Sequence, residues 1–153
     1  MPKLYVLIGV PGSGKSTWAA NQEWATDCAY VSTDKFVDAY AHTAGKTYTE
    51  VFKEAMPRAV ELMAMEVLLA RKQGKDIIWD QTSTTVSSRT KKFRMLPDYH
   101  SIAVVFPTPE ADELTRRLAS RPGKIIPQEV IEAMIENWED PTLEEGFDEI
   151  WYT

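Results

Sequence analysis

The chain has few of the residues that build disulfide frameworks or metal sites. Cys28 is the only cysteine among 153 residues, so no intramolecular disulfide can form. The two histidines, His42 and His100, have no metal-ligand spacing with Cys28 or with each other, which argues against a structural metal site. A lone thiol beside an apolar run is most often a small core residue, and we expect that role for Cys28.

Long hydrophobic runs are also missing. No segment approaches the roughly 20 apolar residues that a membrane-spanning helix needs. The first residues lead straight into an apolar run, which leaves no room for a secretory signal. We therefore expect one cytoplasmic domain over residues 1–153, with no membrane partner and with its oligomeric state left open.

The charge distribution leaves room only for local basic surfaces. A formal net charge of −6 argues against sequence-independent coating of nucleic acid. Positive residues gather in two clusters, and for the first we weigh a solvated helix face against a contact with a polyanion. The first cluster is Arg89, Lys91, Lys92 and Arg94, and the second is Arg116, Arg117, Arg121 and Lys124.

Apolar runs alternate with helical patterns, which is typical of strand-helix-strand units around a parallel sheet. The predicted strands are Leu4–Ile8, Ala29–Ser32, Ile77–Asp80, Ile102–Phe106 and Glu149–Tyr152. The predicted helices are Lys15–Asn21, Asp34–Tyr40, Thr49–Lys72, Ser87–Leu96, Glu110–Ala119 and Gln128–Asn137.

The long third helix carries three local signals. Thr47 and Glu50 have the spacing of a capping box at its start. Pro57 should kink the helix or divide it. Its large apolar residues indicate ordinary core positions, namely Leu62, Met63, Met65, Leu68 and Leu69.

The strongest motif is the glycine-rich segment from Gly9 to Ser16, which matches G-x-x-x-x-G-K-[ST]. It follows an apolar strand and precedes a helical pattern, as a phosphate-binding loop requires. Lys15 would reach the outer phosphates, and the hydroxyl of Ser16 would bind Mg²⁺. Glycine makes up only roughly 7% of residues on average, so a chance match to this motif is rare. A glycine-rich turn that binds no ligand is therefore disfavoured. The residues assigned to the nucleotide are Gly9, Pro11, Gly12, Ser13, Gly14, Lys15, Ser16 and Thr17.

Two aspartates follow predicted strands and therefore point to the phosphate edge of the sheet. Asp80 ends Ile77–Asp80 and could hold Mg²⁺ opposite Ser16, or it could merely cap the turn that follows. Asp34 follows the second strand and could accept the proton of an attacking hydroxyl, or it could cap its own helix.

Two arginines lie just before and at the start of a loop with the character of a lid, Ser120 to Ile126. Arg117 and Arg121 lie four residues apart, so on a helix both guanidinium groups face one side. Arginines on a lid can stabilise the charge of a transferred phosphoryl group and exclude water. The alternative is a pair of surface arginines. Arg116 points elsewhere on the same helix.

Other nucleotide-binding and hydrolytic classes lack support. The guanine-specifying pattern Asn-Lys-x-Asp does not occur, which weakens a GTPase assignment, and no Gly-x-Ser-x-Gly elbow is present.

Taken together, these motifs resemble the kinase domain of bacteriophage polynucleotide 5′-kinase, within the small P-loop kinases that include the zeta-toxin-like sugar-nucleotide kinases. The likeness covers nearly the whole chain. It implies a three-layer α/β P-loop fold with a parallel five-stranded sheet of order 2-3-1-4-5, helices on both faces and a small lid at about residues 117–127. It further implies ATP binding by Gly12 to Thr17, a general base at Asp34, metal support at Asp80, and lid arginines at Arg117 and Arg121.

Two departures limit what the resemblance implies. The larger family member carries a C-terminal phosphatase, for which this sequence leaves no room. The family also has an acceptor-site arginine a few residues after the catalytic aspartate, whereas Val37 stands at the matching position here. The identity of the acceptor hydroxyl is therefore left open.

The expected function is an ATP- and Mg²⁺-dependent kinase that acts on a hydroxyl of a nucleic acid, with DNA favoured over RNA. The leading acceptor is a polynucleotide 5′-OH. A DNA kinase for the hydroxymethyl group of a modified pyrimidine, such as 5-hydroxymethyluracil, comes second, and a nucleoside or sugar-nucleotide kinase third. A non-catalytic ATP-binding module is the remaining alternative. If a phage encodes the chain, the compartment is the host cytoplasm.

Overall fold

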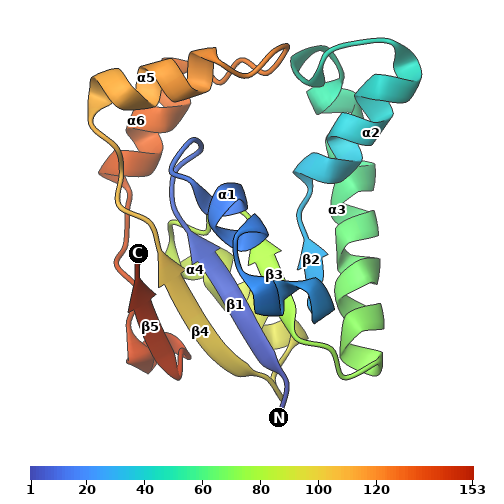
Figure 1. Ribbon diagram of the computed structural model, residues 1–153, viewed down its shortest axis with the longest axis vertical. Coiled ribbons are helices and arrows are strands. Elements are labelled where there is room, and N and C mark those ends of the chain that lie inside the picture. The colour runs from blue at the N-terminus through green and yellow to red at the C-terminus, as the bar shows by residue number, and fades with distance from the viewer.

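The computed structural model describes residues 1–153 and contains a parallel five-stranded sheet of order β2-β3-β1-β4-β5 (Figure 1). The predicted strand order is confirmed, and so is the strand at Glu149–Tyr152, which pairs with β4. The strands are β1 (Lys3–Ile8), β2 (Ala29–Val31), β3 (Ile77–Asp80), β4 (His100–Val105) and β5 (Glu149–Tyr152).

The central position of β1 follows from its composition. A strand that is covered on both faces reads as a continuous apolar run, and Leu4 to Ile8 is such a run. Leu4, Val6 and Ile8 join the core on one face, while Tyr5 and Leu7 join the core on the other. The sheet is therefore the middle of three layers.

Helices cover both faces of the sheet, as predicted. The long α3 packs with α4 against the core on one face, and α1 packs against the core on the other. The helices are α1 (Lys15–Ala20), α2 (Asp34–Ala44), α3 (Tyr48–Lys72), α4 (Val86–Met95), α5 (Ala111–Ala119) and α6 (Gln128–Glu136), and the short 3-10 turns are η1 (Glu23–Asp27) and η2 (Leu143–Glu145). No helix is long and apolar enough to cross a membrane.

The capping box of α3 is confirmed, because the Thr47 side chain accepts from the Glu50 amide and the Glu50 carboxylate accepts from the Thr47 amide. Pro57 does not divide α3, which runs unbroken from Tyr48 to Lys72. Proline removes one backbone donor, and the small buried residues Ala55 and Ala59 on either side hold the helix against its neighbours.

The prediction that the large apolar residues of α3 are core was wrong for three of them. Met65, Leu68 and Leu69 are 60%, 52% and 54% exposed. The buried ridge instead follows a spacing of about four residues and uses mostly small side chains. Its members are Val51, Ala55, Ala59, Met63, Val67 and Ala70.

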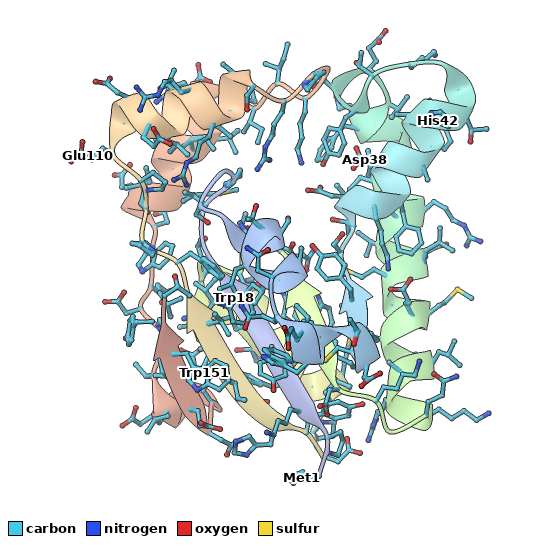
Figure 2. The ribbon with its side chains drawn as sticks, viewed as in Figure 1. Met1, Trp18, Asp38, His42, Glu110 and Trp151 are labelled. Atoms are coloured by element: carbon cyan, nitrogen blue, oxygen red, sulfur yellow. The ribbon has the colours of Figure 1, made fainter.

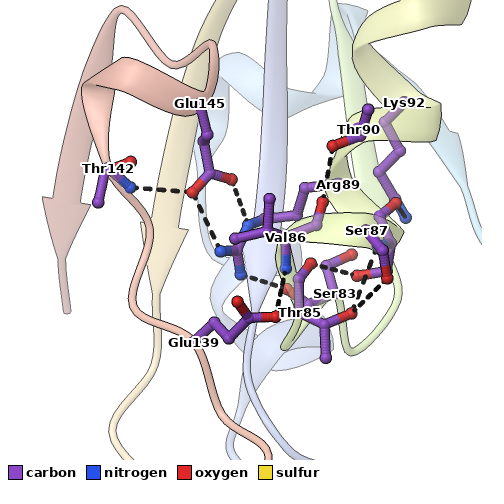
Figure 3. A network of polar contacts seen from close by, with 11 residues as sticks. Ser83, Thr85, Val86, Ser87, Arg89, Thr90, Lys92, Glu139, Thr142 and Glu145 are labelled. Atoms are coloured by element: carbon purple, nitrogen blue, oxygen red, sulfur yellow. Dashed lines mark hydrogen bonds and ion pairs between the residues drawn. The ribbon is translucent and has the colours of Figure 1, made fainter.

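The positive residues of α4 do not form the solvated helix face that was one of the two alternatives, because two of the four are buried. The fully buried Arg89 binds Glu145 through Nε at 2.5 Å and Nη2 at 3.1 Å, and it donates to the Ser83 carbonyl (Figure 3). Lys92 lies with its ammonium 5.1 Å from the Trp79 ring centroid, and burial lowers its pKa to about 8. These cations tie α4 to the core, which the spacing alone could not indicate.

Candidate nucleotide and acceptor site

The predicted phosphate-binding loop connects β1 to α1 at the carboxyl edge of the sheet. Its start is anchored by the Gly9 amide, which donates to the Thr82 carbonyl at 3.0 Å. Gly12 and Gly14 have φ angles of 83° and 98°, a region in which side chains other than glycine are strained. At Gly12 a Cβ atom would also approach Leu114 to 3.0 Å. The loop therefore needs these glycines for its shape.

Most of the predicted nucleotide-binding residues face one cavity. Pro11, Gly12, Gly14, Lys15, Ser16 and Thr17 line it. Gly9 and Ser13 do not line it; Gly9 lies where a Cβ atom would meet Phe106 at 3.0 Å, and Ser13 is buried with no partner for its hydroxyl.

The Lys15 ammonium lies inside the loop and donates to the carbonyls of Gly9 at 2.8 Å and Val10 at 3.0 Å. Burial above all, together with the nearby cations of Arg121 and Lys124, lowers the pKa of Lys15 to about 8, although Asp80 and Asp34 oppose the shift. A buried ammonium with only carbonyl partners is prepared to accept an anion. That Lys15 contacts the phosphates stays a prediction.

Ser16 and Asp80 meet as predicted, with the Ser16 hydroxyl donating to Asp80 Oδ2 at 3.0 Å. Sheet register explains the meeting, because Asp80 pairs with Leu7 two residues before the loop begins. Tyr30 of β2 donates to the same Asp80 oxygen. Burial, followed by the hydrogen bond to Asp80, raises the pKa of Tyr30 and keeps its hydroxyl a donor.

The Ser16 and Asp80 pair also fits a magnesium ion. No group of three or more His, Cys, Asp or Glu residues is arranged to hold a metal. Mg²⁺ rarely uses a cage made only of protein ligands; it takes one or two protein oxygens and completes its shell with phosphates and water. Asp80 and Ser16 would hold the ion on that pattern.

Asp34 begins α2 but does not cap it, because Thr33 occupies the N-cap position. Its carboxylate accepts from the Tyr48 hydroxyl at 2.6 Å through Oδ1 and from the Lys124 ammonium at 2.8 Å through Oδ2. Burial raises the pKa of Asp34, but these two hydrogen bonds and the charges of Lys124 and Arg121 outweigh burial and hold the pKa below its usual value. The side chain is therefore ionised and faces the cavity.

The two predicted lid arginines separate in the structure. Arg121 lines the cavity. Arg117 does not line it; its guanidinium donates to the Gly12 carbonyl at 3.0 Å and to Glu113 at 2.9 Å. The helical spacing fails because α5 ends at Ala119, before Arg121. Arg116 is 73% exposed and pairs with Glu113, as expected of a residue outside the site.

The cavity beneath the lid has a volume of about 600 Å³. Its charged lining residues are Lys15, Asp34, Asp80, Arg121 and Lys124. Apolar side chains of α3 and of the segment from the lid to α6 form the rest of its walls, and Figure 2 shows side chains from the lid and from the α2 side pointing into this space. The apolar lining is Tyr48, Phe52, Met56, Ile125, Ile126, Val130 and Met134.

Three residues of the site escaped the sequence reasoning. Tyr30 and Tyr48 bind the two aspartates from β2 and from the first turn of α3, and no local motif marks them. Lys124 was noted only as part of a positive cluster. Its place within the lid loop was the one signal that could have identified it.

Solved structures share this fold over nearly the whole chain. A putative kinase from Chloroflexus aurantiacus matches with a TM-score of 0.74 and 17% identity, over 99% of this chain and 84% of that chain. A gluconokinase from Sinorhizobium meliloti matches with a TM-score of 0.58 and 18% identity, over 99% and 81%. These similarities show the P-loop kinase fold.

A chain of the Pnkp1/Rnl/Hen1 RNA repair complex is similar at 25% identity with a TM-score of 0.66. The match covers 89% of this chain but only 43% of that chain. The family described as "AAA domain" matches residues 4–141, which include the phosphate loop, both aspartates and the lid. The protein therefore belongs to this AAA domain family and has the fold of a P-loop kinase.

Proposed function

We propose that this protein is an ATP-dependent kinase that transfers the γ-phosphoryl group to a hydroxyl of a nucleic acid, in the first place a polynucleotide 5′-OH. One observation carries the proposal: Lys15 of the phosphate loop and the ionised Asp34 line the same cavity. A donor phosphate held by the loop would thus lie in the same enclosed space as a base for the acceptor hydroxyl.

The chemistry assigns one task to each group. As the acceptor oxygen bonds to the γ-phosphorus, the bond from that phosphorus to the oxygen bridging it to ADP breaks, and the acceptor proton passes to Asp34. Lys15 and Arg121 lie where they can neutralise negative charge on the phosphates, and the lid excludes water. Bound Mg²⁺ would supply further charge neutralisation beside Ser16 and Asp80.

The shape of the acceptor side supports a nucleic acid over a polyol. Beyond Asp34, the cavity wall is the α3 stripe of Tyr48, Phe52 and Met56, with the rings of Tyr48 and Phe52 5.6 Å apart. Such a wall suits the flat face of a base, since aromatic side chains stack on bases of any sequence. The similarity to a chain of an RNA repair complex adds support.

The second candidate is the hydroxymethyl group of a modified pyrimidine in DNA. The observation in its favour is Val37, which is fully buried against Ala41 and Val51 and offers no cation to grip an acceptor phosphate. A base inserted into the cavity would not need that grip. A small-molecule kinase is the third candidate, in view of the fold shared with a gluconokinase.

Label transfer from γ-labelled ATP tests the proposal. The protein is incubated with 5′-OH DNA, 5′-OH RNA, end-blocked DNA containing hydroxymethyluracil, and free nucleosides and sugars, with Lys15→Met as the inactive control. We expect label on the 5′ end of DNA. Label on end-blocked DNA would favour the second candidate. Label on RNA instead of DNA would identify RNA as the nucleic acid acceptor. Label on small molecules alone would refute a nucleic acid acceptor.

A further inference from the structure

Lys124, in the lid loop, forms the most direct contact between the lid and the candidate base. Its ammonium lies 2.8 Å from Asp34 Oδ2 and 4.4 Å from the centroid of the Tyr48 ring. The Lys124 side chain is only 16% exposed, although Asp34 is 51% exposed. A lysine is rarely held this way unless it is paired.

Backbone contacts hold the lid in this position independently of the charge. The Thr49 amide donates to the Gly123 carbonyl at 3.0 Å, and the Ile125 amide donates to the Thr49 hydroxyl at 2.7 Å. These two bonds flank Lys124 and fasten the loop to the first turn of α3. In Figure 1 the segment between α5 and α6 reaches across the phosphate loop toward α2 and α3.

This arrangement weakens Asp34 as a base while Lys124 stays on it. Both oxygens of Asp34 already accept a hydrogen bond, one from Tyr48 and one from Lys124. A base must approach the acceptor hydroxyl within hydrogen-bond distance, and although Oδ2 can accept a second hydrogen bond, a cation bound to it makes the carboxylate a weaker base. Tyr48 belongs to a regular helix, whereas Lys124 has a long side chain on a loop.

Phosphates bound in the cavity would provide a second partner for the same ammonium. Lys124 lines the cavity together with Lys15 and Arg121. Three cations around one cavity repel each other, and the charge of Lys124 lowers the pKa of Lys15. A bound triphosphate would relieve this repulsion and attract the Lys124 ammonium, which has a long side chain on a loop.

We propose that Lys124 is a catalytic residue with two alternating partners: the Asp34 carboxylate that it contacts here, and the transferred phosphoryl group once ATP is bound. The exchange frees Asp34 Oδ2 for the acceptor hydroxyl, so the base becomes available only when the donor is in place. The bond changes are those of the phosphoryl transfer proposed above, on which this inference rests, and Lys124 neither gives up nor takes up a proton in them.

Structures of the protein without nucleotide and with ADP and aluminium fluoride test the exchange directly. We expect the Lys124 ammonium within hydrogen-bond distance of the fluoride group and no longer bonded to Asp34. If the ammonium remains on Asp34 beside the bound phosphoryl mimic, the proposal is wrong. This result does not depend on the acceptor, so a failure of the Lys124 proposal can be told apart from a failure of the nucleic acid assay.

Kinetics of matched variants separate a chemical role from a simple tie of the lid. Lys124→Ala should lower kcat by about 10²-fold, as loss of a charged donor to the transition state does, while Lys124→Arg retains most of the turnover. Thr49→Val removes a lid bond without removing the charge and should mainly raise KM. Lys72→Ala, an exposed lysine at the far end of α3, is the control. An unchanged kcat in Lys124→Ala would overturn the proposal.

The pH profile of kcat/KM for ATP gives a second readout, since it reports the free protein. Lys124 holds the pKa of Asp34 down, so its removal should move the acidic limb to higher pH. The acidic limb of the pH profile of kcat should move less, because in the complete complex Lys124 has already left Asp34. Equal movement of both limbs would show that the pair persists. The other titratable groups around Asp34 are Tyr48, Arg121, Lys15, Tyr30 and Asp38.

Discussion

Replacing Asp34 by asparagine separates the chemical step from nucleotide binding. The side chain keeps its shape, and its carbonyl oxygen can still accept from Tyr48, but it can no longer take a proton at neutral pH. A general base contributes about 10²- to 10⁴-fold to the rate. With 1.36 kcal/mol for each tenfold change, the barrier should rise by about 3–5 kcal/mol.

Nucleotide binding should change much less. In the variant, the amide nitrogen would face the Lys124 ammonium, which now lies 2.8 Å from Oδ2, so the lid loses one ion pair. Because Asp34 is 51% exposed, such a pair is worth at most about 1 kcal/mol. The phosphate loop makes no hydrogen bond to Asp34, so the Kd of ATP should change by less than about fivefold in either direction.

The assay pairs single-turnover label transfer with calorimetric titration of ATP, on the wild type, Asp34→Asn and Asp38→Asn. Asp38 lies one turn further along α2, is exposed and does not line the cavity, so its variant should stay within about threefold of wild type in both measurements. Turnover of Asp34→Asn equal to wild type would refute the assignment of the base. Loss of ATP binding in that variant would refute the separation of the two functions.

Three further predictions concern Arg121, Lys15 and Arg89. Arg121→Ala should lower kcat by about 10²-fold in the transfer assay, whereas Arg116→Ala, whose arginine is 73% exposed, should not, and the reverse order would contradict the placement of the lid. Burial lowers the pKa of Lys15 to about 8, so its ammonium is charged below that pH and neutral above it. In a titration from pH 7 to 9.5, the Kd of ATP should therefore rise above pH 8, by up to tenfold per pH unit. The Lys15→Arg variant should lose this dependence, and a flat wild-type profile would show that Lys15 does not contact the phosphates. Arg89→Met leaves Glu145 buried without its partner and should lower the free energy of unfolding by about 3–5 kcal/mol in urea, while the exposed Arg94→Met on the same helix should change it by less than about 0.5 kcal/mol; equal midpoints would refute the buried pair.

Much of the fold could be predicted because its signals are local. The apolar run of β1, the glycine-rich loop and the following helix are contiguous, and the capping box of α3 needs only Thr47 and Glu50. The strand order came from the family resemblance, and sheet pairing agrees with it. The meeting of Ser16 with Asp80 was predictable because the carboxyl ends of parallel strands share one edge.

Predictions failed where the type of a side chain does not decide whether it lies in the core or at the surface. Met65 and Leu68 have the residue type of a core, yet the ridge of α3 that packs inward carries alanines. Arg89 and Lys92 have the residue type of a surface, yet partners distant in sequence bury them. Periodicity locates the faces of a helix but does not tell which face meets a neighbour.

The sequence by itself determined the phosphate loop and the parallel sheet that presents it, because backbone conformation and alternation of apolar runs are written in adjacent residues. Only the tertiary structure decided that Lys124 pairs with Asp34, that Tyr48 completes the pair, and that Arg121 rather than Arg117 lines the cavity. Asp34 and Lys124 are 90 residues apart, and the end of α5 and the docking of the lid on α3 bring them together. Such contacts depend on where helices stop and which surfaces pack, and neither is encoded at any one site of the chain.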